Sequence, residues 1–145
     1  MAEDFIHVLN LMEKENKNQA NILCMGTYLK KFNYKLNSKQ VELTQWVSSK
    51  HNMGMALSRS TWKKITQCRN HFCQYDDYNW DWSLLHVSLN CMKEKLQVLM
   101  VRGPRVFHIG ECGVHHKKKD CASSLVIEKV NYIIKAASQY FYPER

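Results

Sequence analysis

The sequence predicts a single domain of the α/β class over residues 1–145, and three observations predict it. Apolar residues recur at three- and four-residue steps in four segments, as they do along the buried face of a helix. Short apolar or alternating runs, bounded by glycine, proline or polar residues, lie between these segments and favour strands. The 145 residues contain no repeat, low-complexity linker or interior boundary, and this length builds one modest core.

The first half of the chain should start with a helix over residues 4–17. Asp4 can cap this helix, whose apolar positions are Phe5, Val8, Leu9 and Met12. The elements expected next are a strand over 22–25, a loop over 27–39, a strand over 41–47, a turn over 51–54 and a strand over 53–57. In the strand 41–47, one face carries Val41, Leu43, Gln45 and Val47.

The second half alternates helices and strands. Ser60 should cap a helix over 61–68 with Trp62 and Ile65 facing inward. Asn79 is a suitable cap for a helix over 80–91, which places Asp81 in the first turn. The apolar stripe of this helix is Trp82, Leu85 and Leu89, widened by Leu84 and Val87. Strands over 96–101 and 105–109, a loop over 110–120 and a helix from Ser124 follow, and that helix should bury Val126, Val130, Ile133, Ile134 and Ala137.

Composition limits the class of protein. Hydrophobic residues make up 45% and charged residues 23% of the chain, which excludes a disordered protein. The formal net charge of +8 favours anionic partners such as phosphates, nucleotide sugars or acidic surfaces. No apolar run approaches the ~20 residues of a membrane span. The acidic start, M-A-E-D-F, lacks the basic and apolar regions of a secretory signal.

Six cysteines are many for a cytosolic protein, and they favour either an oxidising compartment or a metal site. The absence of a secretory signal conflicts with an oxidising compartment. A chain that forms part of a longer protein would resolve the conflict.

The run from Cys73 to Trp82 concentrates acids and aromatic rings. Asp76, Asp77 and Asp81 stand among Tyr75, Tyr78, Trp80 and Trp82. Aromatic faces stack on the C–H faces of sugars and carboxylates accept their hydroxyl protons, so the run suits a carbohydrate ligand. Asp81 could serve as a general base on a sugar hydroxyl. The alternative is an aromatic turn leading into a core helix, with acids at the helix start because the macrodipole favours them there.

The run F-H-I-G-E-C-G-V-H-H offers metal-binding residue types. His108 follows an expected strand and precedes a glycine turn, where it can act as a ligand or serve a structural role. A zinc site made of Cys112, His115, His116 and Cys121 would have non-standard spacing, and a Cys112–Cys121 disulfide is favoured over it in an oxidising compartment. A zinc-stabilised basic domain is therefore the weakest alternative.

The lysine pairs and triplets do not predict nucleic-acid binding. Lys30-Lys31 and Lys117-Lys118-Lys119 could hold phosphates or simply be solvated. A nucleic-acid module would interleave aromatic residues with the basic ones, whereas here the aromatic residues accompany acids. No nucleic-acid partner is expected.

Two long runs, F-C-Q-Y-D-D-Y-N-W-D-W-S-L and P-R-V-F-H-I-G-E-C-G-V-H-H-K-K, resemble the C-terminal half of the N-acetylglucosaminyltransferase II family of N-glycan processing. Shorter matches are M-G-T-Y at 25–28, H-N-M-G-M-A-L-S-R at 51–59 and Q-Y-F-Y-P-E at 139–144. The resemblance covers nearly the whole chain in order.

This resemblance implies the C-terminal portion of a GT-A type, Rossmann-like fold, incomplete over residues 1–145. It also implies a UDP-GlcNAc donor, a Mn²⁺ cofactor and an inverting transfer of GlcNAc to the 2-hydroxyl of the α-1,6-arm mannose of N-glycans on glycoproteins. The parent protein would be a membrane-anchored enzyme of the Golgi lumen. By position, Asp81 matches the general base, Trp80 flanks the acceptor sugar, Tyr78 and Asn52 match acceptor contacts, and His108 matches the manganese ligand.

The chain departs from the family in several respects. Lys31 stands near a donor-contacting arginine of the family, and lysine lacks the planar two-pronged bond of arginine. The family pattern pairs Cys68 with Cys91 and Cys112 with Cys121, places the partner of Cys73 beyond residue 145, and offers no counterpart for Cys24. The acidic metal motif, the nucleotide-binding half and the membrane anchor have no match in these residues.

We therefore expect the acceptor side of a transferase site without its nucleotide side. The chain alone should not catalyse transfer, and its sheet should expose an apolar edge. The alternative is a non-catalytic module that binds a sugar or a partner.

Overall fold

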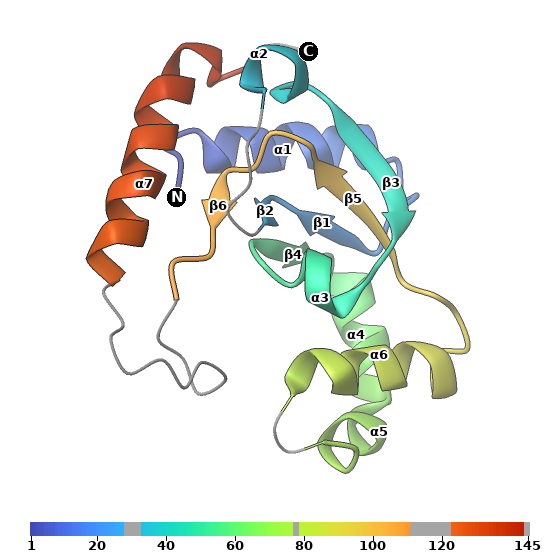
Figure 1. Cartoon of the computed structure of the whole chain (residues 1–145). Helices are drawn as coiled ribbons and strands as arrows, with labels where there is room; N and C mark the ends of the chain where they lie inside the picture. The colour runs from blue at the N-terminus through green and yellow to red at the C-terminus, as the bar shows by residue number, and fades with distance from the viewer. Residues whose placement is uncertain (28–32, 77–78, 111–122, 144–145) are drawn as a thin grey trace.

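The computed structural model describes residues 1–27, 33–76, 79–110 and 123–143, and Figure 1 shows the chain. It has the mixed α/β architecture that the sequence predicts. Its elements, in order, are α1 (Phe5–Asn16), β1 (Ile22–Cys24), β2 (Gly26–Thr27), α2 (Tyr34–Asn37), β3 (Val41–Gln45), α3 (Ser48–His51), β4 (Met55–Leu57), α4 (Arg59–Gln67), α5 (Arg69–Cys73), α6 (Trp80–Asn90), β5 (Gln97–Val101), β6 (Val106–Phe107), α7 (Ser123–Ala137) and the 3₁₀ helix η1 (Ser138–Tyr140).

A mixed four-stranded sheet forms the centre of the molecule, in the order β3-β5-β1-β4. Its central pair, β1 and β5, is parallel, and each of these strands has an antiparallel neighbour on its outer side. Leu23 of β1 and Leu43 of β3 both lie opposite Leu99 of β5. The short strands β2 and β6 form a separate parallel pair. A central parallel pair is typically covered on both faces, as it is here.

Helices cover both faces of the four-stranded sheet (Figure 1). Helix α1 lies on one face, where Val8 and Met12 pack against Leu23, Leu99 and Val101. Helices α4 and α6 lie on the opposite face, where Ile65 and Leu84 pack with Ile22, Trp46 and Val98. Helix α7 packs separately against β6 and the start of α2, through Val126, Val130, Ala137, Phe107 and Tyr34. This helix buries the face that its sequence predicts, with Ile133 and Ile134 partly buried.

Asp4 does not cap α1, contrary to the prediction. It precedes the helix, but its side chain makes no capping hydrogen bond. Its carboxylate instead accepts from Nε of Arg105 at 2.9 and 3.0 Å, and both side chains are fully buried. The same carboxylate accepts the backbone N–H of Tyr142 at 3.0 Å, and the guanidinium lies 5.1 Å from the ring centre of Phe141. This ion pair therefore ties the N-terminal segment and the C-terminal segment to the turn between β5 and β6.

The orientation of α4 differs from the prediction. Ser58, not Ser60, caps this helix, because the Ser58 hydroxyl accepts from the N–H of Thr61 at 3.1 Å. Ile65 is buried as expected, whereas the Trp62 side chain is 56% exposed. The helix has nine residues and starts two residues earlier than predicted. Nine residues contain too few apolar positions to predict the buried face of the helix from their spacing alone.

Helix α6 buries only part of the predicted stripe, and Leu85 of that stripe is partly buried against the core. Leu84 and Val87 are buried together with the small residues Ser83 and Ser88, whereas Trp82 and Leu89 are exposed. Two serines replace apolar residues on the inner face because each has a hydrogen-bond partner there: Ser83 donates to the carbonyl of Asp76 and Ser88 to that of Glu94. Apolar periodicity counts such serines as polar and shifts the predicted face.

Three short helices were not predicted. The segment 33–39 contains α2, with Tyr34 buried, where the sequence predicts a loop, while residues 28–32 lie outside the described residues. Helices α3 and α5 have four and five residues. Such lengths give about one turn, which is too short for a helical period to be visible. Within the described residues, no helix is long and apolar enough to span a bilayer.

Candidate functional site

The start of α6 carries Trp80, Asp81 and Trp82, and local hydrogen bonds fix this turn. Asn79 stands at the cap position but does not cap with its side chain. Its N–H and its Nδ2 donate to the two carboxylate oxygens of Asp76 at 3.3 and 3.4 Å, and its carbonyl accepts from the N–H of Trp82 and of Ser83. The hydroxyl of the fully buried Ser83 donates to the carbonyl of Asp76 at 3.2 Å. Asp76 therefore holds the first turn of α6 from outside the helix.

The two predicted site residues of this turn remain accessible to a ligand. Trp80 is 49% exposed and the side chain of Asp81 is half-buried. Within the described part of the chain, Asp81 belongs to no ion pair, because the ion pairs are Asp4–Arg105 and Lys64–Glu94. An uncommitted carboxylate beside an exposed indole fits a base that meets a sugar hydroxyl. Asp81 also stands in the first turn of α6, where the helix macrodipole favours an acid. The alternative that Asp81 only stabilises the helix is therefore equally consistent with its position.

The far end of α6 is fastened to α5 by a disulfide between Cys68 and Cys91, with an S–S distance of 2.01 Å. This is the pairing that the family resemblance implies. Tyr75 stacks on His86 of α6 with ring centres 4.0 Å apart. The helix that carries Asp81 is thus fixed at both ends. Cys24 and Cys73 are free with respect to the described residues, and burial raises the pKa of the Cys24 thiol.

Asn52 follows α3 in a loop that is packed tightly against β1 and β2. The thiol of Cys24 donates to the carbonyl of Met53 at 3.3 Å, and the N–H of Met25 donates to the carbonyl of Gly54 at 3.1 Å. A side chain at Gly26 would lie 2.6 Å from the carbonyl oxygen of Met53, so only glycine fits there. Asn52 Oδ1 is buried, and none of the described residues donates to it. A buried acceptor without a donor calls for an explanation, and a ligand hydroxyl is one.

His51 is a buried residue that stabilises this loop by hydrogen bonds. It was not predicted as a site residue. It is buried, its Nδ1 accepts the N–H of Val47 at 2.9 Å, and its carbonyl accepts from Nε1 of Trp46 at 3.2 Å. An accepting Nδ1 requires a neutral ring in the tautomer that carries its proton on Nε2. Burial is the main reason that the pKa of His51 is lowered from its ordinary value of 6.5, and the neighbouring charge of Lys50 lowers it further.

The stability of the protein is therefore expected to fall as the pH drops below about 6.5. The unfolded chain protonates His51 near pH 6.5 and the folded chain does so only at lower pH, so acid favours the unfolded state in between. Urea titrations at pH 7.5 and at stepwise lower pH would measure this loss. In the variant His51→Gln, the free energy of unfolding should fall less steeply as the pH drops, because the contribution of His51 is gone. An unchanged pH dependence would show that other groups cause the loss of stability.

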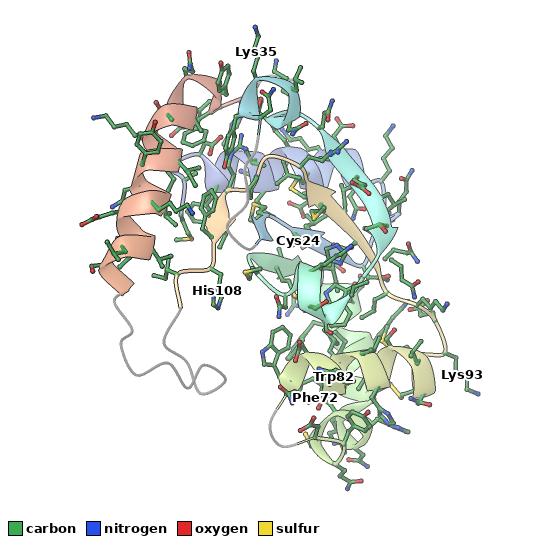
Figure 2. The ribbon with its side chains drawn as sticks, in the orientation of Figure 1. Cys24, Lys35, Phe72, Trp82, Lys93 and His108 are labelled. Carbon is green, nitrogen blue, oxygen red and sulfur yellow. A yellow bond between two sulfur atoms is a disulfide. The ribbon has the colours of Figure 1, made fainter. Side chains whose placement is uncertain are left out.

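His108 follows β6 and is exposed, and Figure 2 shows it at the end of that strand, on a different element from the Trp82 side chain at the start of α6. Among the described residues, no three His, Cys, Asp or Glu side chains are grouped so that they could hold a metal ion. His108 alone thus offers one imidazole, and the described residues do not make a manganese site by themselves.

Several predicted site residues lie outside the described residues. These are Tyr78, Lys31, Cys112 and Cys121, together with the zinc alternative His115 and His116. A hollow of about 430 Å³ lies between α1 and β4, where Leu9, Leu23 and Ala56 line it, and it contains none of the predicted site residues. The structure thus describes three accessible candidates, Trp80, Asp81 and His108, and the buried acceptor of Asn52.

Comparison with known proteins places the chain among the glycosyltransferases. The model of the N-acetylglucosaminyltransferase II (MGAT2) family matches residues 1–145, so the chain belongs to that family. It is 37% identical over 147 aligned residues to the alpha-1,6-mannosyl-glycoprotein 2-beta-N-acetylglucosaminyltransferases of Mus musculus and Homo sapiens, covering 99% of this chain and 33% of theirs. The enzyme of the same name from Arabidopsis thaliana is 38% identical over 74 residues, which cover 48% of this chain and 16% of that protein. The chain spans about a third of the length of its mammalian relatives.

Proposed function

We propose that this chain forms the acceptor side of an inverting glycosyltransferase site, in which GlcNAc passes from UDP-GlcNAc to the 2-hydroxyl of the α-1,6-arm mannose of an N-glycan. The name of the relatives supports a mannosyl-glycoprotein acceptor and a β-linked GlcNAc product. The observation that carries the proposal is that an exposed indole, Trp80, and the carboxylate of Asp81, which has no ion-pair partner among the described residues, stand on one helical turn.

Asp81 acts in this proposal as the general base. Its carboxylate takes the proton of the mannose 2-hydroxyl while that oxygen attacks the anomeric carbon of GlcNAc, and the bond to the UDP oxygen breaks on the opposite side. Trp80 stacks on the acceptor sugar and Asn52 Oδ1 accepts a sugar hydroxyl. Tyr78 is a further acceptor contact and Lys31 a donor contact, both on the resemblance alone.

His108 supplies one imidazole ligand to a Mn²⁺ ion in this proposal. The ion would neutralise charge on the diphosphate of the donor. Because the described residues hold no complete ligand set, the remaining ligands must come from residues outside them. The parent enzyme would work in the Golgi lumen as a membrane-anchored protein, and the 145-residue chain alone should transfer no GlcNAc.

Replacing Trp80 with alanine is expected to weaken binding of a mannose-terminated N-glycan to the purified chain about tenfold, a change of ~1.4 kcal/mol. The lost contact is the stack of the indole on the sugar ring. Isothermal titration calorimetry without donor or metal measures the affinity.

Trp62→Ala is the matched control, because Trp62 is an equally exposed tryptophan on α4 rather than on the proposed site. Its affinity should equal that of the unmodified chain, and Asp81→Asn should keep glycan binding as well. Equal losses in both tryptophan variants would contradict the proposed site. Binding combined with measurable transfer by this chain would contradict the proposal that these residues form only the acceptor side of the site.

A further inference from the structure

Three hydrogen bonds of His51 fix the backbone on the N-terminal side of Asn52. The N–H of His51 donates to the carbonyl of Val47 at 2.9 Å, and its Nδ1 accepts the N–H of Val47 at 2.9 Å. Its carbonyl accepts from Nε1 of Trp46 at 3.2 Å. Because the ring is buried, losing the bond to Val47 would leave a polar group in the interior without a partner. His51 therefore fixes the end of α3 from which Asn52 extends.

The C-terminal side of Asn52 is fixed by a different contact. The thiol of Cys24 donates to the carbonyl of Met53 at 3.3 Å, and burial raises the pKa of this thiol, so that it stays neutral. Asn52 stands between the two fixed sides with φ −91° and ψ 2°, in the sparsely allowed bridge region where many active-site residues lie. Of the groups that hold its two neighbours, the ring of His51 is the one that titrates near neutral pH.

The helix that His51 ends lies against the helix of the proposed base. Helix α3 contacts α6, which carries Asp81, as Figure 1 lets the reader follow. Trp46, whose indole binds the carbonyl of His51, packs with Leu84 of α6 in one buried cluster. The ring of His51 thus acts on Asn52 at a position next to the helix where the acceptor is proposed to bind.

We propose that His51 is a positioning residue for the acceptor glycan: its neutral ring holds Asn52 Oδ1 in place for a sugar hydroxyl, and protonation of the ring releases it. This inference rests on the proposed function, in which Asn52 Oδ1 accepts that hydroxyl. None of the described residues donates to Asn52 Oδ1, so the backbone at His51 decides where this atom lies. A protonated ring carries hydrogen on Nδ1 and cannot accept, so it would face the N–H of Val47 donor against donor.

The surroundings of the ring keep it neutral near pH 7. Burial lowers the pKa of His51 from 6.5, Lys50 lowers it further, and Glu42 of β3 opposes both. Of the elements packed against α3, α6 carries the titratable residues Asp81 and His86, and the two residues of β2 carry none. The ring therefore becomes protonated only below pH 6.5, and the affinity for the glycan should fall in the same pH range.

Calorimetric titration of the full 145-residue chain with a mannose-terminated N-glycan, from pH 7.5 to about pH 5, tests the inference. At pH 7.5, Asn52→Ala should bind about fivefold more weakly than the unmodified chain, the effect of one hydrogen bond between neutral groups. As the pH falls, the affinity of the unmodified chain should approach that of Asn52→Ala, which should stay constant. By reciprocity, saturating glycan should lower the pKa of His51, which NMR of the ring Cε1–H measures.

Three variants assign the pH dependence to His51. His51→Asn is the conservative variant, because its side-chain oxygen can accept from the N–H of Val47 but does not titrate. It should match the affinity of the unmodified chain at pH 7.5 and keep that affinity at lower pH. His86→Gln and Asp81→Asn, the matched controls on α6, should retain the pH dependence. Far-UV circular dichroism identifies the pH values at which each variant is folded, and affinities are compared there.

The outcomes separate this inference from the proposed function. If Trp80→Ala weakens binding but the affinity of the unmodified chain does not change with pH, the role of His51 is overturned and the proposed function stands. A pH dependence that persists in Asn52→Ala or in His51→Asn also overturns the role of His51, because another group then causes it. A chain that binds no glycan at pH 7.5 contradicts the proposed function and this inference with it.

Discussion

Replacing Asp4 with asparagine should lower the free energy of unfolding by about 3–5 kcal/mol, the largest loss expected for a single substitution in this chain. The change leaves Arg105 fully buried with its charge uncompensated. It also weakens the acceptor of the Tyr142 N–H, which anchors the C-terminal segment. Urea-induced unfolding followed by far-UV circular dichroism measures the loss.

Two further variants distinguish the effect of losing this ion pair from the effect of losing any acidic residue near the N-terminus. Glu3→Gln removes the neighbouring acid, which is exposed, and should change stability by less than about 0.5 kcal/mol. The double variant Asp4→Leu with Arg105→Met should recover much of the lost stability, because it removes both charges and leaves no unpaired charge in the interior. Equal stability of Asp4→Asn and Glu3→Gln would contradict the importance of the pair.

Removing the Cys68–Cys91 disulfide by Cys68→Ser with Cys91→Ser should cost about 2–4 kcal/mol, because the bond restrains a loop with a sequence separation of 23 in the unfolded chain. The loss should concentrate in α5 and α6, since these two helices pack on each other through the bond. Thermal unfolding of the oxidised protein and of the double variant gives the difference.

Cys73→Ser supplies the control, because Cys73 is exposed and has no disulfide partner among the described residues. Its melting temperature should stay unchanged, and reduction of the unmodified chain with dithiothreitol should reproduce the double variant. A double variant as stable as the oxidised protein would contradict a structural role for the bond.

The strands and the long helices could be predicted because their apolar residues carry a clear period. The strand at Ile22–Cys24 and the inner face of α7 are examples, and the predicted start of α6 at Trp80 is correct. The faces of α4 and α6 were predicted only in part. Ile65, Leu84 and Val87 are buried as predicted. Trp62 and Trp82, however, are apolar yet exposed, and Ser83 and Ser88 are polar yet buried.

The tertiary partners of polar residues could not be predicted. Asp4 and Arg105 are 101 positions apart, and nothing local at Asp4 distinguishes a helix cap from a buried ion pair. His51 likewise appeared as a turn residue, although it holds the loop of Asn52. The assignment of Asp81 and Trp80 to a site stays a prediction, which the sequence suggested because acids and aromatic rings are concentrated around them. The structure adds only that Trp80 is exposed and Asp81 half-buried.

The proposed site at the start of α6 is tested most directly by the indole N–H signals of the four tryptophans during titration with a mannose-terminated N-glycan. The signal of Trp80 should shift most, that of the adjacent Trp82 less, while those of the buried Trp46 and of Trp62 on α4 stay fixed. Shifts of Trp62 with an unmoved Trp80, or no shift of any indole at saturating glycan, would contradict the assignment of Trp80 and Asp81 to the acceptor.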